Sequence, residues 1–297
     1  MELIDLHTHG LAGLDTRSKV PDDYLSLALV MSEKGTGAFL PTLYPMPTSE
    51  MRAVMKAVAF AMEAQGKGAG GARILGVNLE GPFVNPARAG ALGKDDFTPP
   101  DLEAFIRLVD GFAGVIKVMT VAPELPGALR LIEKAVAMGI RVNMGHSDAT
   151  FEQARDGRLA GATGVTHLFN AMSGLHHRAP GLAGYALSDD SLYVEVIADL
   201  AHLHPATLRI ALKCKPPGRI LLVSDSLGPA KTPGVPEMGP LYMDDGVTLA
   251  GSGSVLADCV QNLVSLGVPF DTAMAAASVN PLRYLGGSRR LQPLENT

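Results

Sequence analysis

Cysteine and charged residues are both scarce in this chain of 297 residues. Only Cys214 and Cys259 occur, and they are not spaced as a zinc pair, which favours a reducing compartment over a disulfide scaffold. Charged residues make up 19% of the chain and the net charge is −5, which gives no electrostatic basis for binding nucleic acid or a membrane surface. No apolar run of about 18 residues is free of charges, so we expect no membrane-spanning helix.

Apolar residues, in contrast, make up 47% of the chain, enough to bury a substantial core. The length is usual for one large α/β barrel, and we expect a single domain over residues 1–297. The chain opens directly on a strand-like stretch, without a basic region or an apolar signal segment. We therefore expect a cytoplasmic protein.

Strand-like and helix-like stretches alternate along the chain. After a first strand at the N-terminus, strands are predicted over residues 38–40, 73–79, 115–121, 140–144, 164–167, 192–198 and 219–223. Helices are predicted over residues 21–34, 49–65 (with Ser49 as the cap), 100–109, 129–138, 151–159, 205–213, 255–266 and 272–285. Eight strands alternating with helices predict a (β/α)8 TIM barrel, with an open doubly wound sheet as the alternative.

Two histidines, His7 and His9, mark the end of the first strand. Alternate residues of a strand point the same way, so these side chains are expected on one face, about 6–7 Å apart along the strand. Paired imidazoles suit a divalent metal such as zinc or iron. The alternative is a strand that carries two polar residues on its solvent-exposed face.

Polar residues of the same kind follow several other predicted strands. In a barrel the carboxyl ends of the strands converge on one mouth, where the catalytic groups of this fold lie. Four imidazoles and two carboxylates suit two metals that share a carboxylate, or one metal beside a spare pocket. The candidate ligands are His7, His9, Glu80, His146, His167 and Asp225.

Each of these residues also has a purely structural alternative. Glu80 could cap a helix, although Gly81-Pro82 does not allow a regular helix to begin there. His146 could be a loop histidine, His167 a core histidine, and Asp225 the first residue of a turn. Their common position at strand ends favours the metal interpretation.

The motifs at these strand ends resemble the amidohydrolase superfamily and, within it, the N-acetylglucosamine-6-phosphate deacetylase family. The resemblance runs from residue 2 to about residue 286. His-x-His alone is shared by many amidohydrolases, whereas the Glu-Gly-Pro-Phe and Thr-His-Leu-Phe-Asn-Ala-Met segments are specific to this branch. The segments that carry the resemblance are His7-Thr8-His9, Leu79-Glu80-Gly81-Pro82-Phe83, Gly145-His146-Ser147, Thr166-His167-Leu168-Phe169-Asn170-Ala171-Met172, His176-His177-Arg178-x-Pro180-Gly181 and Val223-Ser224-Asp225.

The resemblance implies a role for each matching residue. Glu80, His146 and His167 would hold the main metal ion, and His7 and His9 a second one, with Glu80 shared and Asp225 nearby. The ion would be zinc, with iron or another divalent metal as the alternative, at one or two ions per chain. Asp225 would accept a proton from the attacking water and return it to the departing amine.

The resemblance also implies the ligand and the partner. Asn170 and Ala171 would contact the substrate, a phosphorylated amino sugar, and His202 would contact a sugar or phosphate oxygen. Arg178 would reach the phosphate in the neighbouring subunit of a homodimer.

The chain departs from the family pattern in three places. The small β-sandwich that usually flanks the barrel is expected to be missing or vestigial. The loop after Glu-Gly-Pro-Phe reads Gly90-Ala91-Leu92, where the family has a histidine that steadies the substrate carbonyl, and the family's Ala-Asp-Gly reads Ala198-Asp199-Leu200. Two alternatives to a sugar-phosphate deacetylase therefore stay open: an amidohydrolase acting on another N-acyl or cyclic amide, and a non-catalytic protein that binds an amino-sugar phosphate.

Overall fold

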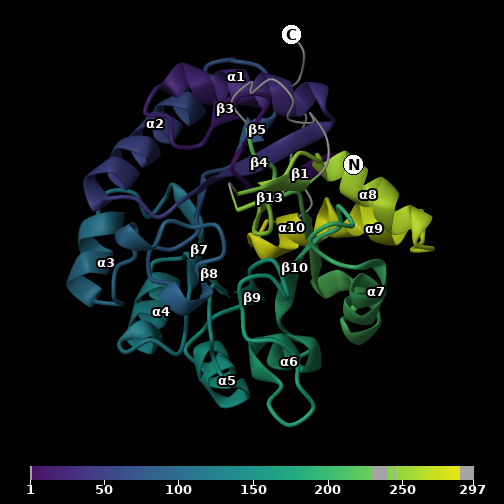
Figure 1. The fold of residues 1–297 in the computed structure, drawn as a ribbon. Helices are drawn as coiled ribbons and strands as arrows, with labels where there is room; N and C mark the ends of the chain where they lie inside the picture. The colour runs from purple at the N-terminus through teal and green to yellow at the C-terminus, as the bar shows by residue number, and fades with distance from the viewer. Residues whose placement is uncertain (1, 229–239, 244, 288–297) are drawn as a thin grey trace.

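Eight parallel strands follow one another around a ring in chain order, and helices surround them (Figure 1). The computed structural model describes residues 2–228, 240–243 and 245–287. Two main-chain hydrogen bonds close the ring between its last and first strands, from the Asp225 amide to the His7 carbonyl (2.9 Å) and from the His9 amide to the Ser226 carbonyl (2.7 Å). The predicted (β/α)8 barrel is thereby confirmed, and the open sheet is excluded.

The barrel strands are β1 (Leu3–Thr8), β4 (Thr36–Leu43), β6 (Val77–Leu79), β7 (Ile116–Val121), β8 (Arg141–Met144), β9 (Gly164–Val165), β10 (Tyr193–Ile197) and β11 (Ile220–Val223). Short β5 (Arg73–Ile74) pairs with β4, and two hairpins form from β2 (Gly10–Leu11) with β3 (Leu14–Asp15) and from β12 (Pro240–Tyr242) with β13 (Leu249–Ser252).

Most of the helices run around the outside of the strands in chain order, whereas the last one, α10, lies across the middle of the ring (Figure 1). The helices are α1 (Pro21–Glu33), α2 (Thr48–Gly66), α3 (Leu102–Val109), α4 (Ala128–Ala137), α5 (Phe151–Leu159), α6 (Gly181–Ser188), α7 (Pro205–Cys214), α8 (Leu256–Ser265), α9 (Phe270–Ala276) and α10 (Val279–Tyr284). Short 3-10 turns occur at Pro86–Arg88, Lys94–Asp96 and Pro217–Arg219. Within the described ranges, none of these helices has the length and apolarity needed to cross a bilayer.

The apolar core has two parts. The larger part lies between the strands and the surrounding helices. The smaller part combines residues from β1, β4, β7, β10 and β11, which can meet only inside the ring, with Tyr284 of α10. Its members include Ile4, Leu40, Val118 and Leu221. The barrel interior is therefore packed, as is usual in this fold, and only its mouth is left for polar chemistry.

Two predicted elements are interrupted in the structure. The strand predicted over residues 73–79 divides into β5 and β6 at Gly76, whose φ is +141° and where a Cβ would lie 2.3 Å from the Val115 carbonyl oxygen. The helix predicted over residues 272–285 divides into α9 and α10. Pro281 has no N–H for the carbonyl of Ala277, which instead accepts a hydrogen bond from the Ile4 amide of β1 (2.7 Å).

Other local features also differ from the prediction. Helix α6 was not predicted, because seven of its eight residues are buried and its sequence has no polar face to give a helical period. Ser49 does not cap α2. Pro47 is the cap residue, without a side-chain hydrogen bond, and Ser49 lies in the first turn. The predicted strand over residues 164–167 ends at Val165, because His167 already has a positive φ of 28°.

Candidate metal centre

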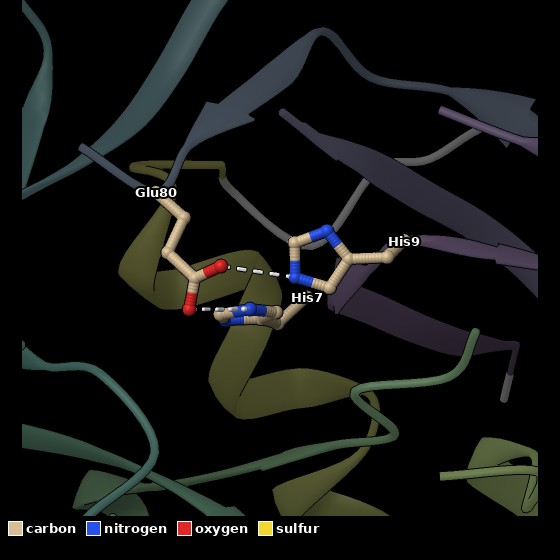
Figure 2. A group of neighbouring side chains, drawn as sticks. All are labelled: His7, His9 and Glu80. Carbon is tan, nitrogen blue, oxygen red and sulfur yellow. Dashed lines mark ion pairs between the residues drawn. The ribbon is translucent and has the colours of Figure 1, made fainter. Parts of the chain in front are cut away.

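The carboxylate of Glu80, just past the end of β6, lies at the centre of four imidazoles. Its Oε1 is 3.0 Å from the Nε2 atoms of both His146 and His167, and 3.4 Å from Nε2 of His7. Its Oε2 is 3.0 Å from Nε2 of His9. Figure 2 shows the two oxygens turned toward His7 and His9. The structure thus brings together residues that are up to 160 positions apart in the sequence.

Three of the imidazoles have a hydrogen-bonding partner at Nδ1, the ring nitrogen that does not face Glu80. Nδ1 of His9 donates to the Thr42 carbonyl (3.1 Å) and Nδ1 of His146 to the Arg88 carbonyl (2.9 Å), while Nδ1 of His7 lies 3.1 Å from Glu195. A carbonyl oxygen can only accept, so these hydrogen bonds place the proton of His9 and His146 on Nδ1 and leave Nε2 with a lone pair. This arrangement is typical of histidines that bind metals.

The unsatisfied atoms of the cluster fit a divalent cation. His7 Nε2 is buried and has no hydrogen-bond partner among the described residues. The Nε2 atoms of His146 and His167 lie 3.1 Å apart. Two groups bring three potential ligand atoms within 4.8 Å of one another, His7–His9–Glu80 and Glu80–His146–His167. Imidazole nitrogen with carboxylate oxygen is a donor set suited to zinc or iron.

The charges of the cluster also favour a cation. Burial alone would raise the pKa of Glu80, but the charges on His7 and His9 and the hydrogen bonds to His146 and His167 hold that pKa well below its ordinary value. Burial alone would lower the pKa of His7, yet Glu80 and Glu195 keep it well above its ordinary value. Positive charge, carried by a proton or by a metal ion, is therefore stabilised between these groups.

Asp225 follows β11 and faces the same centre. Its Oδ1 is 3.6 Å from Nε2 of both His7 and His9, and its Oδ2 is 3.7 Å from Nε2 of His202. The residue has a positive φ of 50°, an uncommon backbone conformation that clusters at functional sites.

His202 is oriented by a carboxylate of its own. Its Nδ1 lies 2.8 Å from Oδ2 of Asp199, and Oδ1 of the same carboxylate accepts hydrogen bonds from the amides of Ala201 and His202. Despite burial, these hydrogen bonds and the charge of His202 lower the pKa of Asp199 to about 2. The Nε2 atom of His202 is thereby aimed at Asp225.

A cavity of about 210 Å³ opens beside the cluster at the barrel mouth. The predicted substrate residues Asn170, Ala171 and His202 line it, and so does Leu92. The complete lining is His9, Tyr44, Glu80, Gly90, Ala91, Leu92, His146, His167, Asn170, Ala171, His202, Asp225, Leu249 and Ala250. The barrel therefore brings the predicted ligands and most predicted substrate residues to one place.

Arg178 is the predicted site residue that does not join this group. It is exposed, it does not line the cavity, and its Nη1 lies 2.9 Å from Nε2 of its neighbour His177.

Two buried carboxylates beside the cluster were not predicted. Glu195 of β10 contacts His7, and Asp5 of β1 accepts hydrogen bonds from the His7 amide (3.2 Å) and the Ser224 hydroxyl (2.5 Å). Burial raises the pKa of Asp5 to about 6 against these hydrogen bonds. An acidic residue with apolar neighbours on both sides within a strand was the available signal in both cases.

Comparison with protein-family models finds no match for this chain. Among curated proteins, the chain is 36% identical to the N-acetylgalactosamine-6-phosphate deacetylase of Escherichia coli O157:H7 over 293 residues, which cover 95% of this chain and 77% of that protein. It is also 36% identical to the N-acetylglucosamine-6-phosphate deacetylase of Vibrio furnissii, covering 99% of this chain and 75% of that protein.

Solved structures agree with these relatives. The N-acetyl-D-glucosamine-6-phosphate deacetylase of Mycobacterium smegmatis superposes with a TM-score of 0.86 at 29% identity, over 96% of this chain and 78% of that one. A dihydroorotase, at 13% identity and a TM-score of 0.58, shares the fold alone. As the motifs at the strand ends predicted, the chain belongs to the amidohydrolase superfamily and, within it, to the N-acetylglucosamine-6-phosphate deacetylase family.

Proposed function

We propose that this protein is a metal-dependent deacetylase that removes the N-acetyl group from an amino-sugar 6-phosphate and releases acetate. The observation that carries this proposal is the convergence of four imidazoles and the carboxylates of Glu80 and Asp225 on one small cavity. Membership of the deacetylase family supports the reaction type.

The substrate we propose is N-acetylglucosamine-6-phosphate. A variant of the Mycobacterium smegmatis enzyme has been solved in complex with N-acetyl-D-glucosamine-6-phosphate, and this chain superposes on it with a TM-score of 0.87. The Escherichia coli relative is named for the galactosamine epimer, so the two epimers form the natural substrate comparison.

Two groups of residues would hold the metal. We propose zinc, at Glu80, His146 and His167, with a second ion at His7 and His9 that shares Glu80. A divalent ion bound there would acidify a water molecule and polarise an amide carbonyl.

Asp225 is the residue we assign to proton transfer. Its carboxylate faces the ligand cluster on one side and His202 on the other, at the edge of the cavity. As the water oxygen bonds to the carbonyl carbon, Asp225 accepts a water proton, and it delivers that proton to the nitrogen as the C–N bond breaks. His202, held by Asp199, and the Asn170 amide are placed to bind substrate oxygens.

A homodimer in the cytoplasm completes the proposal. Arg178 is exposed and does not line the cavity of its own chain, and we propose that it reaches the substrate phosphate of a second subunit. A guanidinium binds phosphate oxygens through two parallel hydrogen bonds, which Lys cannot reproduce.

Leu92 favours a second candidate function, the hydrolysis of a different N-acyl group. The residue is 8% exposed and lines the cavity, where it presents methyl groups in a loop for which the family resemblance implies a histidine. An apolar wall of this kind suits an acyl chain.

The purified protein should release acetate from N-acetylglucosamine-6-phosphate, faster than from the galactosamine epimer. A chelator should abolish the activity and added zinc should restore it, and Glu80→Gln should lower the metal content because Glu80 belongs to both ligand groups. Acetate release is measured together with metal content by mass spectrometry. Full activity in a demonstrably metal-free preparation would contradict the proposal, and ligand binding without any product would indicate a non-catalytic binding protein.

Asp225→Asn should lower kcat by several orders of magnitude while substrate and metal stay bound, because the amide cannot carry the proton. A positioned acid or base typically contributes about 10²–10⁴ in rate. Steady-state kinetics and metal analysis of the variant provide the test. A kcat within tenfold of the parent would assign proton transfer to another group.

Leu92→Ala should shift the acyl preference toward longer chains, because it removes part of the cavity wall. Discrimination of one methylene in an apolar pocket is worth about 10–200-fold, so the kcat/KM ratio of N-propionyl to N-acetyl substrate should rise by at least about tenfold. The ratio is measured within one preparation, which cancels any loss of folded protein. An unchanged ratio would mean that Leu92 does not contact the acyl group.

Arg178→Ala should raise KM for the phosphorylated substrate far more than KM for the unphosphorylated sugar, because only the former uses the guanidinium. Arg155→Ala is the matched control, because Arg155 is also an exposed arginine but lies elsewhere, on α5. It should alter neither KM value. Equal effects of Arg178→Ala on both substrates would remove Arg178 from the phosphate site.

A further inference from the structure

Glu195 is a buried carboxylate that the proposed reaction does not use. It lies in β10, within the apolar run Tyr193–Ile197, and its exposed fraction is 0%. A strand interior is an unfavourable place for a charge, because removing a carboxylate from water costs several kcal/mol unless its oxygens are satisfied. Its contacts should therefore show what offsets this cost.

Three donors face the two oxygens of Glu195. Oε1 accepts from Nδ2 of Asn143 (2.7 Å), and Oε2 accepts from the His167 amide (3.3 Å) and lies 3.1 Å from Nδ1 of His7. His7 is its one ion-pair partner among the described residues. Every contact of Oε2 thus belongs to a candidate metal ligand.

The far side of this network is anchored in the barrel interior. The Tyr284 hydroxyl donates to Oδ1 of Asn143, which leaves Nδ2 of that amide to face Glu195. Gly164 of β9 leaves the room for this amide, because a Cβ there would lie 2.1 Å from Oδ1 of Asn143. Asn143 therefore has one orientation, and Glu195 has a fixed position.

We propose that Glu195 is a positioning residue that makes His7 a ligand for the second metal ion. With the carboxylate accepting from Nδ1, the His7 proton lies on that atom, and the buried Nε2 presents its lone pair toward Glu80 and Asp225. A carboxylate behind the imidazole also raises the basicity of the ligand. The inference rests on the metal centre proposed above. It links the second ion to Glu195 through the His7 imidazole, whereas Glu195 contacts His167 at the main-chain amide and not at the imidazole that would bind the first ion.

Glu195→Gln is the decisive variant. Glutamine has nearly the same volume as glutamate, but its side chain has only one acceptor oxygen. The three donors around Glu195 need two. An amide nitrogen facing His7 would move the His7 proton to Nε2 and block the ligand. We expect the second ion to bind about 10–100-fold more weakly, while the affinity for the first ion stays unchanged. Zinc titration of the metal-free full-length protein against a chromogenic chelator, with ions counted by mass spectrometry, measures both affinities without any substrate.

Two comparisons separate positioning from general damage. Glu124→Gln is the matched control, since Glu124 accepts from Asn85, Ser147 and the Asp148 amide and contacts none of the four imidazoles. It should leave both ions bound. In a His7→Asn background, Glu195→Gln should weaken metal binding no further, because its effect passes through His7.

Each remaining outcome decides the question. Unchanged affinity for the second ion in Glu195→Gln, or equal loss of both ions, overturns the assignment. If Glu195→Gln does not fold, Glu195→Asp keeps the charge but withdraws it from His7, and it should show the same selective loss. A parent protein that binds only one ion yet deacetylates overturns this inference alone. A parent that binds two ions without deacetylating overturns the proposed function alone.

Discussion

The rest of the site depends on one carboxylate, that of Glu80, which four imidazoles share. Without it, the Nε2 atoms of His146 and His167 would face each other at 3.1 Å with no charge between them. With it, negative charge lies where it stabilises either protons or metal ions, and both candidate ligand groups contain it. Two ions placed there would be linked through Glu80, so the loss of Glu80 would affect both, whereas the loss of His7 would affect one.

The main-chain hydrogen bonds that close the barrel between its first and last strands also assemble this site. His7 belongs to the first strand and Asp225 directly follows the last, and the hydrogen bond between their main chains is one of the two that close the ring. Asp5 ties the same two strands together through the amide and hydroxyl of Ser224. The positive φ of Asp225 is therefore held by contacts on both sides. A barrel that failed to close here would lose its second candidate ligand group and the residue proposed for proton transfer together.

The barrel and the convergence of the candidate ligands could be predicted, because strand ends are marked in the sequence by a change from apolar residues to His, Glu or Asp. What could not be predicted depends on tertiary contacts. The division of the last predicted helix follows from the Ala277 carbonyl turning to Ile4 of β1, and α6 has no polar face to reveal its period. Glu195 and Asp5 were overlooked for a related reason, since a strand pattern shows that a position is buried but not which donors meet it.

The cavity beside the candidate ligands is lined by two chemically different sets of residues. One set consists of His202, Asn170 and the ligand cluster, and the other of the small or apolar residues Leu92, Ala91 and Ala250. A ligand that matches both sets needs polar oxygens together with a small apolar group. An N-acylated sugar meets this requirement, because it carries hydroxyl and carbonyl oxygens beside an acyl methyl group. In the proposed reaction, Leu92 would limit the length of the acyl chain, while Glu80 and Asp225 would act on the bond that joins it to the sugar.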